Sequence, residues 1–214
     1  MKELNKYIDH TQLKAFATSE DIKKLCEEAI KYDFYAVCVN GCHVENVKNN
    51  LSKSDVKIAA VIGFPLGAMS TAAKIFEAEQ AIKDGADEID MVINIGWLKE
   101  GKLKKVEEDI AKIKKAIGNK ILKVIIETCY LTEEEKKTAC KLALAAKADF
   151  VKTSTGFGTG GATIEDVKLM KKAVGNQLQI KASGGIRDAE TAKKYIKNGT
   201  NRIGTSSGIK IVSN

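Results

Sequence analysis

Short apolar runs alternate with longer segments of helical periodicity along the whole chain. Each run is rich in Val and Ile, and a polar or glycine-bearing turn separates it from the segment that follows. The runs predict buried strands, and the longer segments predict helices. The eight predicted strands are Tyr7–Thr11, Ala36–Asn40, Lys57–Gly63, Glu88–Asn94, Ile121–Glu127, Phe150–Ser154, Leu178–Ser183 and Arg202–Ser207. The predicted helices are Ser19–Lys31, Val44–Leu51, Thr71–Asp84, Leu98–Ile117, Thr132–Ala146, Thr163–Ala173 and Ala189–Lys197.

This alternation predicts an α/β protein with parallel strands, because a helix follows each strand and allows a right-handed crossover. Strands that are apolar throughout indicate a sheet covered on its faces. Eight such units match a single-domain (β/α)8 TIM barrel, and 214 residues lie near the lower limit of about 200 for that fold. A doubly wound open sheet is the competing fold, but no Gly-x-Gly-x-x-Gly opens the first helix. We expect one domain spanning residues 1–214.

The composition fits a globular protein, with 44% hydrophobic and 29% charged residues. No apolar stretch approaches the ~20 residues of a membrane span. The formal charge is +7, yet the lysines recur at helical spacing between glutamates, as in residues 102–120. That pattern is typical of a solvated helix face and argues against a nucleic-acid partner. The opening MKELNKYIDHT has no apolar signal segment, so we expect a cytoplasmic protein without a membrane partner.

The five cysteines show no closely spaced pairs, and their odd number favours free thiols in a reducing compartment. One cluster, formed by Cys38, Cys42 and His43, contains residue types that bind metals. Its Cys-x-x-x-Cys-His spacing lacks a second ligand group, so we do not expect a zinc site.

Two lysines stand at equivalent places in neighbouring predicted strands: Lys152 in FVKTSTGFGTGG and Lys181 in QIKASGGIR. Buried lysines are rarely unpaired, so both are expected to pair with carboxylates or to have a lowered pKa. A lysine with a lowered pKa attacks a carbonyl as a neutral amine, which makes Schiff-base chemistry one hypothesis. A structural ion pair inside the barrel is the other, and neither lysine alone decides between the two.

Polar residues gather at or near the carboxyl ends of the predicted strands, the active-site face of a TIM barrel. Taken singly, each has a structural explanation: Asn40 can cap a helix, His10 can be a hydrogen-bonded core histidine, and Cys38 can be a small buried apolar residue. Their convergence on one rim favours a functional site. The set is Asp9, His10, Thr11, Cys38, Asn40, Asp90, Asn94, Glu127, Lys152, Lys181, Ser206 and Ser207.

Glycine and serine concentrate in the last three strand–helix units, at residues 156–161, 184–185 and 204–208. Small residues let backbone N–H groups approach an oxyanion, and this fold commonly binds phosphate after strands seven and eight. Turn formation alone is the alternative, since such connections need glycine somewhere. The concentration in these units favours a phosphate site.

Together, the motifs resemble deoxyribose-phosphate aldolases over nearly the whole chain. They are YIDHTQL, AVCVN, EIDMVINIG, KVIIET, FVKTSTGFGTGGAT, IKASGGIR and RIGTSSG. The resemblance implies a class I aldolase on a (β/α)8 barrel, without metal or other cofactor. Its reaction would be the reversible cleavage of 2-deoxy-D-ribose 5-phosphate to D-glyceraldehyde 3-phosphate and acetaldehyde, in deoxyribonucleotide catabolism. The implied partners are this sugar phosphate and aldehydes, with a homodimer as one open assembly state.

The resemblance also implies catalytic roles by motif. Lys152 would form the Schiff base, Lys181 would perturb its pKa and exchange protons, and Asp90 would donate and accept protons. The implied substrate-binding residues are Asp9, Thr11, Cys38, Lys123, Thr155, Gly156, Gly184, Gly185, Ser206 and Ser207.

Three features qualify these roles. Lys123 would join the charge network, but a salt bridge with Asp9 or Glu127 explains it equally well. Phe157 stands where some family members carry a lysine, so the phosphate is expected to depend on the backbone amides of Gly184, Gly185 and Ser207 and on helix N-termini. The printed sequence ends without the C-terminal tyrosine of some members, so proton exchange is expected to be slower or to rely on Asp90 and water.

Two other functions stay open at this point. One is a transaldolase-like barrel enzyme that applies the same chemistry to another sugar phosphate. The other is a barrel that binds a phosphate ligand without catalysis. Lys152 separates the catalytic hypotheses from pure binding, because a binding protein needs no neutral amine.

Overall fold

The structure, a computed structural model, describes residues 3–213. Eight parallel strands form a closed barrel in chain order, with β1 paired to both β2 and β8. The strands are β1 (Ile8–Gln12), β2 (Ala36–Asn40), β3 (Lys57–Ile62), β4 (Glu88–Val92), β5 (Ile121–Ile125), β6 (Phe150–Lys152), β7 (Gln179–Ser183) and β8 (Arg202–Thr205). This topology confirms the predicted (β/α)8 barrel and excludes the open sheet.

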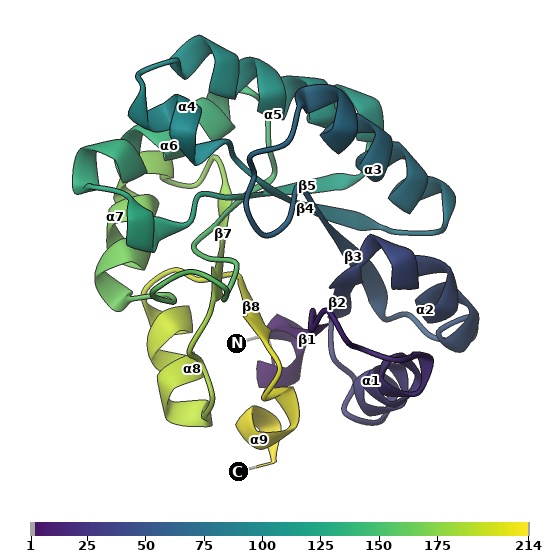
Figure 1. The fold of residues 1–214 in the computed structure, drawn as a ribbon. Coiled ribbons are helices and arrows are strands. Elements are labelled where there is room, and N and C mark those ends of the chain that lie inside the picture. The colour runs from purple at the N-terminus through teal and green to yellow at the C-terminus, as the bar shows by residue number, and fades with distance from the viewer. Residues whose placement is uncertain (1–2, 214) are drawn as a thin grey trace.

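Helices surround the strands on the outside of the barrel (Figure 1). They are α1 (Ser19–Lys31), α2 (Val44–Asn50), α3 (Thr71–Lys83), α4 (Ile95–Lys99), α5 (Leu103–Ile117), α6 (Glu133–Ala145), α7 (Ile164–Val174), α8 (Ala189–Lys197) and α9 (Gly208–Val212). Three short 3-10 turns, η1 (Leu4–Tyr7), η2 (Gly41–His43) and η3 (Thr128–Tyr130), complete the described elements. No helix within residues 3–213 has the length and apolar character needed to cross a bilayer.

Side-chain caps explain where several of these helices begin. At α1, Thr18 accepts the backbone N–H of Asp21, whose side chain accepts the N–H of Thr18 in return. Thr132 and Glu135 form the same reciprocal capping box at α6. Each such cap satisfies N–H groups that a helix leaves unpaired and contributes about 1 kcal/mol. The capping residues are local sequence signals, which is why these starts were predictable to within one residue.

The predicted helix Leu98–Ile117 is wrong as a single element. Gly101 has a φ of +71°, in the left-handed region that glycine tolerates, and it follows the end of α4. The N–H of Lys102 then bonds to the carbonyl of Trp97, at 2.9 Å, before α5 begins. Helix α9 was not predicted, because five residues after a glycine-serine turn are too few to show a periodic pattern.

Alternation along each strand sorts its side chains between two environments. On β4, Ile89 and Met91 belong to the main apolar core together with helix residues such as Ile110. Glu88 and Asp90 point to the opposite face of the strand and pair with charged groups from other strands inside the barrel. The strand period therefore places apolar side chains under the helices and charged ones in the barrel interior.

Another buried ion pair lies outside the barrel and joins α3 to α5. Lys74 is fully buried, and its amino group donates to Asp109 at 2.7 Å and to the carbonyl of Val92 at 2.9 Å. Thr71 donates to the second oxygen of the same carboxylate, at 2.7 Å. The buried charge of Lys74 is thus paired with a buried carboxylate, and it connects two helices to the end of β4.

Lys74→Met is expected to lower the free energy of unfolding by about 3–5 kcal/mol, because Asp109 would keep a buried charge without its cation. Urea denaturation measures the change. Lys104 is the matched control, since its amino group lies 4.0 Å from Glu108 on the exposed face of α5. Lys104→Met should cost about 0.5 kcal/mol or less. Equal losses in the two variants would show that burial does not govern the effect.

Candidate active site

Seven charged side chains meet inside the barrel, and each is at most 2% exposed. They come from six of the eight strands: Asp9, Glu88, Asp90, Lys123, Lys152, Lys181 and Arg202. The β-sheet register pairs Lys152 directly with Lys181, and Lys181 with Arg202. This register confirms that the two lysines stand at equivalent places on neighbouring strands.

Ion pairs of alternating charge connect these residues in a chain. Lys181 Nζ lies 2.8 Å from Asp90 Oδ2 and 2.5 Å from Asp9 Oδ2. Arg202 Nη2 lies 2.5 Å from Asp9 Oδ1 and 2.9 Å from Glu88 Oε2. Lys181 and Arg202 therefore each bridge one carboxylate on β1 and one on β4.

Lys123 closes the chain into a ring. Its amino group lies 2.6 Å from Glu88 and 2.7 Å from Asp90, on the neighbouring strand β4. The salt bridge considered for Lys123, with Asp9 or Glu127, is therefore wrong as to the partner. Register explains the difference, because Lys123 stands opposite Asp90 and Glu88 lies two residues earlier on the same face. The six residues of this ring are hereafter called the charged ring.

Lys152 is attached to the charged ring at one point only. Among residues 3–213, its one ion-pair partner is Asp90, whose Oδ2 lies 2.7 Å from Lys152 Nζ and also contacts Lys181. The ring by itself contains three carboxylates and three cations. A neutral Lys152 consequently leaves the whole cluster without net charge, whereas a protonated Lys152 adds an unbalanced buried cation.

The electrostatic surroundings separate the two lysines. Burial lowers the pKa of Lys152, Asp90 opposes that shift, and Lys181 adds to it, so that the net change is downward. Burial also acts to lower the pKa of Lys181, but Asp9 and Asp90 together raise it above its ordinary value. The pKa of Asp90 stays well below its usual range because Lys123, Lys152 and Lys181 outweigh its burial. Lys181 and Asp90 are thus held charged, and Lys152 is the lysine of this pair that loses its proton more readily.

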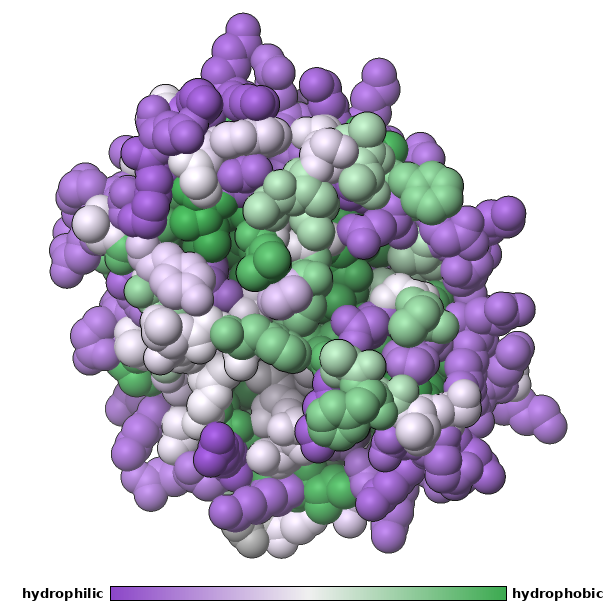
Figure 2. Space-filling model, viewed as in Figure 1, coloured by the Kyte–Doolittle hydropathy of each residue, from purple (hydrophilic) through white to green (hydrophobic). Residues whose placement is uncertain are grey.

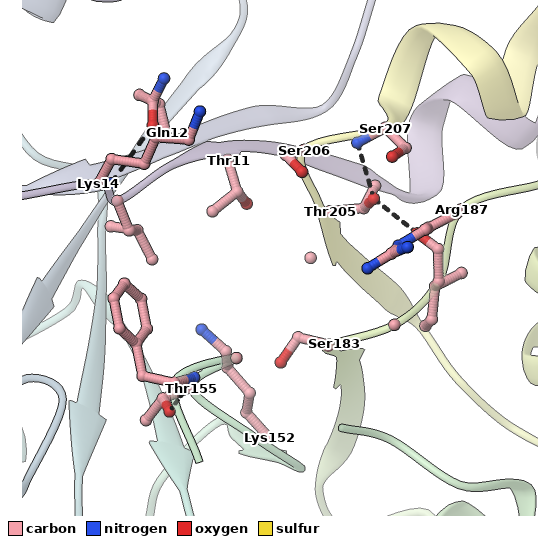
Figure 3. Close-up of a pocket in the computed structure, with 17 residues that line it drawn as sticks. Thr11, Gln12, Lys14, Lys152, Thr155, Ser183, Arg187, Thr205, Ser206 and Ser207 are labelled. Carbon is pink, nitrogen blue, oxygen red and sulfur yellow. Dashed lines mark hydrogen bonds between the residues drawn. The ribbon is translucent and has the colours of Figure 1, made fainter. Parts of the chain in front are cut away.

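A cavity of about 270 Å³ lies at the carboxyl ends of the strands, and Lys152 is one of its lining residues. In Figure 3 the Lys152 amino group points into the space between Thr155, Thr11 and Ser183. Seven of the predicted binding residues line it: Thr11, Thr155, Gly156, Gly184, Gly185, Ser206 and Ser207. The predicted residues Asp9, Cys38 and Lys123 do not line it and are fully buried.

Glycines shape the side of this cavity that follows β7. Gly184 and Gly185 have φ values of +86° and +85°, and a Cβ on Gly161 would lie 2.3 Å from the carbonyl oxygen of Gly184. Two backbone segments can approach this closely only without side chains. The N–H of Ser207, which was expected to be available to a phosphate, instead donates to Thr205 Oγ1 at 2.9 Å.

An apolar wall closes the opposite part of the barrel mouth. Leu13, Cys38, Ala59 and Val61 form a buried cluster against which Phe64 packs. Burial raises the pKa of the Cys38 thiol, as expected for a small apolar residue in this wall. Figure 2, in the same view as Figure 1, shows apolar residues near the centre of this face and hydrophilic residues around its edge.

Other rim candidates take structural positions. His10 Nε2 lies 2.7 Å from Glu28 on α1, and its ring packs against Phe34. Asn94 accepts the backbone N–H of Trp97 and caps α4. Neither residue lines the cavity. Within residues 3–213 no three His, Cys, Asp or Glu side chains are arranged to hold a metal. The side chains of the Cys-x-x-x-Cys-His motif are likewise not arranged in this way.

The comparisons with known proteins agree with this geometry. A family model described as DeoC/LacD family aldolase matches residues 4–214. The chain belongs to this family.

Several proteins similar to this chain match it over nearly its full length. A deoxyribose-phosphate aldolase of Finegoldia magna is 63% identical over 210 residues, which is 98% of this chain and 99% of the relative. A solved structure described as QR15, an aldolase, has a TM-score of 0.94 at 43% identity and covers 100% of this chain and 96% of its own. The deoxyribose phosphate aldolase of Aeropyrum pernix has a TM-score of 0.90 at 30% identity, covering 98% and 89%. These matches confirm the resemblance seen in the motifs.

Three functional candidates escaped sequence reasoning. Glu88 and Arg202 stand at the first positions of β4 and β8, away from the rim at the carboxyl ends of the strands. Alternation from Asp90 back to Glu88 was the available signal for the first. Arg187 lines the cavity beside the glycines, and its guanidinium points toward the open space in Figure 3. A cation two residues after a pair of glycines, at the end of IKASGGIR, was the signal for it.

Proposed function

We propose that this chain is a class I aldolase that reversibly cleaves 2-deoxy-D-ribose 5-phosphate to D-glyceraldehyde 3-phosphate and acetaldehyde, in deoxyribonucleotide catabolism. The observation that carries the proposal is the Lys152 amine, which lines the cavity, has a lowered pKa and contacts a carboxylate shared with Lys181. The family match and the Finegoldia magna relative, which is named for this activity, support the choice of substrate.

In this mechanism the neutral Lys152 amine adds to the C1 aldehyde of the open-chain sugar, and loss of water leaves an iminium ion. The C3 hydroxyl then gives up its proton, the C2–C3 bond breaks, and its electron pair moves into the iminium to form an enamine. D-glyceraldehyde 3-phosphate leaves with the new carbonyl. Protonation of the enamine at C2 and addition of water release acetaldehyde and regenerate the amine.

Asp90 and Lys181 support different parts of this cycle. The Asp90 oxygen that lies 2.7 Å from Lys152 Nζ would stabilise the iminium charge as it forms. Because Asp90 stays ionised, we assign proton movement at the C3 hydroxyl and at C2 to Asp90 together with a bound water. Lys181, held protonated, disfavours a second cation beside it and so helps to lower the pKa of Lys152.

Purified protein treated exhaustively with EDTA is expected to release acetaldehyde from 2-deoxy-D-ribose 5-phosphate at the untreated rate. The iminium already serves as the electron sink that a metal supplies in other aldolases. A coupled alcohol dehydrogenase assay, run on a portion of protein separated from the chelator, measures the product. Activity lost on chelation and restored by zinc would assign the reaction to a different class of aldolase.

The kcat/KM for unphosphorylated 2-deoxy-D-ribose is expected to be at least roughly 100-fold lower than for the 5-phosphate, because binding at the phosphate helps orient the reacting carbons. Gly184 and Gly185, together with Arg187, line the part of the cavity that we assign to the phosphate. Arg187→Gln should lower kcat/KM about 10- to 150-fold for the phosphate ester, given about 1.5–3 kcal/mol for a charged hydrogen bond. The same variant should leave the unphosphorylated sugar unaffected. Equal efficiency with both sugars would remove the phosphate site.

We further propose that residues 1–214 act as one domain in the cytoplasm. The pairing of β1 with β8 supports one domain, since removing either end would open the barrel.

The free cysteines in the described chain fit the reducing conditions of the cytoplasm. The oligomeric state is open between the homodimer considered from the sequence and a tetramer, the state described for the Aeropyrum pernix relative.

A further inference from the structure

The buried carboxylate of Glu127, just after β5, makes its closest contacts with one residue of the active-site loop, and Cys129 Sγ adds a longer contact to Oε1 at 3.9 Å. Glu127 is 2% exposed and has a φ of +52°. Its two oxygens accept the backbone N–H of Thr155, at 3.2 and 3.3 Å, and Oε2 also accepts the Thr155 hydroxyl. Gly158 covers the carboxylate, because a Cβ there would lie 3.2 Å from Glu127 Cδ. The contact is therefore closely packed, and in it Thr155 is the donor and Glu127 the acceptor.

These contacts fix the orientation of the Thr155 hydroxyl. A hydroxyl group has one hydrogen to donate and two lone pairs that accept. The hydrogen of Thr155 goes to Glu127, and one lone pair accepts the N–H of Phe157 at 3.0 Å. Thr155 lines the same cavity as Lys152 (Figure 3). What it can offer to a bound molecule is the remaining lone pair.

We propose that Glu127 is a positioning residue for substrate specificity, which makes Thr155 a pure hydrogen-bond acceptor and so selects sugar phosphates that donate a hydroxyl next to the reacting carbon. The inference rests on the proposed aldolase function. In D-glyceraldehyde 3-phosphate the hydroxyl concerned is the one on C2, which corresponds to C4 of the deoxyribose. It keeps its proton throughout the reaction, unlike the C3 hydroxyl of the deoxyribose, and can therefore serve as a constant donor.

The test is aldol addition of acetaldehyde to three acceptors: D-glyceraldehyde 3-phosphate, its 2-fluoro analogue and its 2-deoxy analogue. Fluorine accepts weakly but cannot donate, and the deoxy compound does neither. The protein should prefer the hydroxyl compound over both analogues by about tenfold or more in kcat/KM. Comparing each ratio between variants removes the effect of fluorine on the reactivity of the aldehyde itself.

Glu127→Gln keeps the shape of the side chain but changes its hydrogen bonding. The amide oxygen can still accept the N–H of Thr155, while the NH2 group donates to the Thr155 hydroxyl and turns its hydrogen toward the cavity. We expect this variant to lower the hydroxyl-over-fluorine ratio about tenfold. Its kcat/KM for the 2-deoxy acceptor should stay within about twofold of the original, since that compound makes no such bond.

Two variants of Thr155 serve as matched controls. Thr155→Val should abolish the preference for the hydroxyl compound, whereas Thr155→Ser, which keeps the hydroxyl, should retain it. In the Thr155→Val background Glu127→Gln should have no further effect on the ratio. If Glu127→Gln does not fold, a preference for the hydroxyl compound that persists in Thr155→Val still overturns the proposal, because Glu127 acts only through Thr155.

Two results would overturn the proposal: an unchanged hydroxyl-over-fluorine ratio in Glu127→Gln, which includes an equal loss for all three acceptors, or a preference retained in Thr155→Val. Trapping of acetaldehyde with borohydride on Lys152 in the same variants reports separately on the proposed function. An adduct on Lys152 together with unaltered acceptor ratios would reject only the role of Glu127 and would leave the aldolase mechanism intact. No adduct in the unsubstituted protein would reject the aldolase mechanism on which it rests.

Discussion

Acetaldehyde followed by borohydride will leave an N-ethyl group on Lys152, and Lys152→Met will abolish aldol cleavage. Lys152 is the buried lysine of the cavity that has a lowered pKa and only one carboxylate partner within the described chain. Removing the nucleophile from an enzyme with covalent catalysis costs on the order of 10⁵-fold or more in kcat. Peptide mapping by mass spectrometry locates the adduct, and an aldehyde-release assay measures the loss.

The methionine variant should stay folded, which separates loss of chemistry from loss of structure. The charged ring is balanced without Lys152, so replacing this lysine by an apolar side chain of similar length leaves no uncompensated ring charge. Circular dichroism and thermal unfolding should match the unsubstituted protein. An adduct found chiefly on Lys181 or Lys123 would refute the assignment of the nucleophile.

Lys181→Leu will raise the pKa of Lys152 and lower kcat/KM about 100-fold near neutral pH. The two amino groups contact the same Asp90 oxygen, at 2.7 and 2.8 Å. Two cations about 5 Å apart at an effective dielectric of about 20 repel by roughly 3 kcal/mol, or about two pKa units. The ring would also retain three carboxylates against two cations, so a protonated Lys152 would restore the balance.

The sign of the pH effect follows from the reactive form of Lys152. Only the neutral amine attacks, so imine formation is lost as the pH falls below the Lys152 pKa. Raising that pKa moves the acid limb of the profile to higher pH by about two units, and activity should recover in alkaline buffer. Lys74→Met, which removes a buried lysine outside the ring, is the control and should leave the profile unchanged. A Lys181→Leu variant with the original rate and profile would show that Lys181 is only structural.

The order of the strands, and their starts to within one residue, were predictable because their signals are local, whereas β4, β5, β6 and β8 end two residues earlier than predicted. Val- and Ile-rich runs ending in glycine or polar residues mark each strand, and capping pairs such as Thr132 and Glu135 mark helix starts. The failure at residues 98–117 was local as well. Gly101 lies within a continuous helical pattern, and only its backbone conformation shows that the pattern is interrupted there.

The identity of the ion-pair partners was not predictable in the same way. Arg202 and Glu88 are 114 residues apart and come from strands that are not neighbours. Asp9 stands opposite Gly204 in the register of β1 and β8, yet it binds Arg202, two residues earlier on β8. These partners depend on barrel closure and on the reach of long side chains across its interior.

The sequence by itself determined the barrel, the rim and the two lysines in register, because hydropathy period, turn residues and strand ends are encoded in neighbouring residues. Only the tertiary structure decided which lysine is left with a single partner, and that Glu127 orients Thr155 rather than pairing with Lys123. The physical reason is that charge balance and hydrogen-bond direction depend on all the polar and charged groups enclosed together in the barrel. That set exists only after strands from both ends of the chain have closed around it.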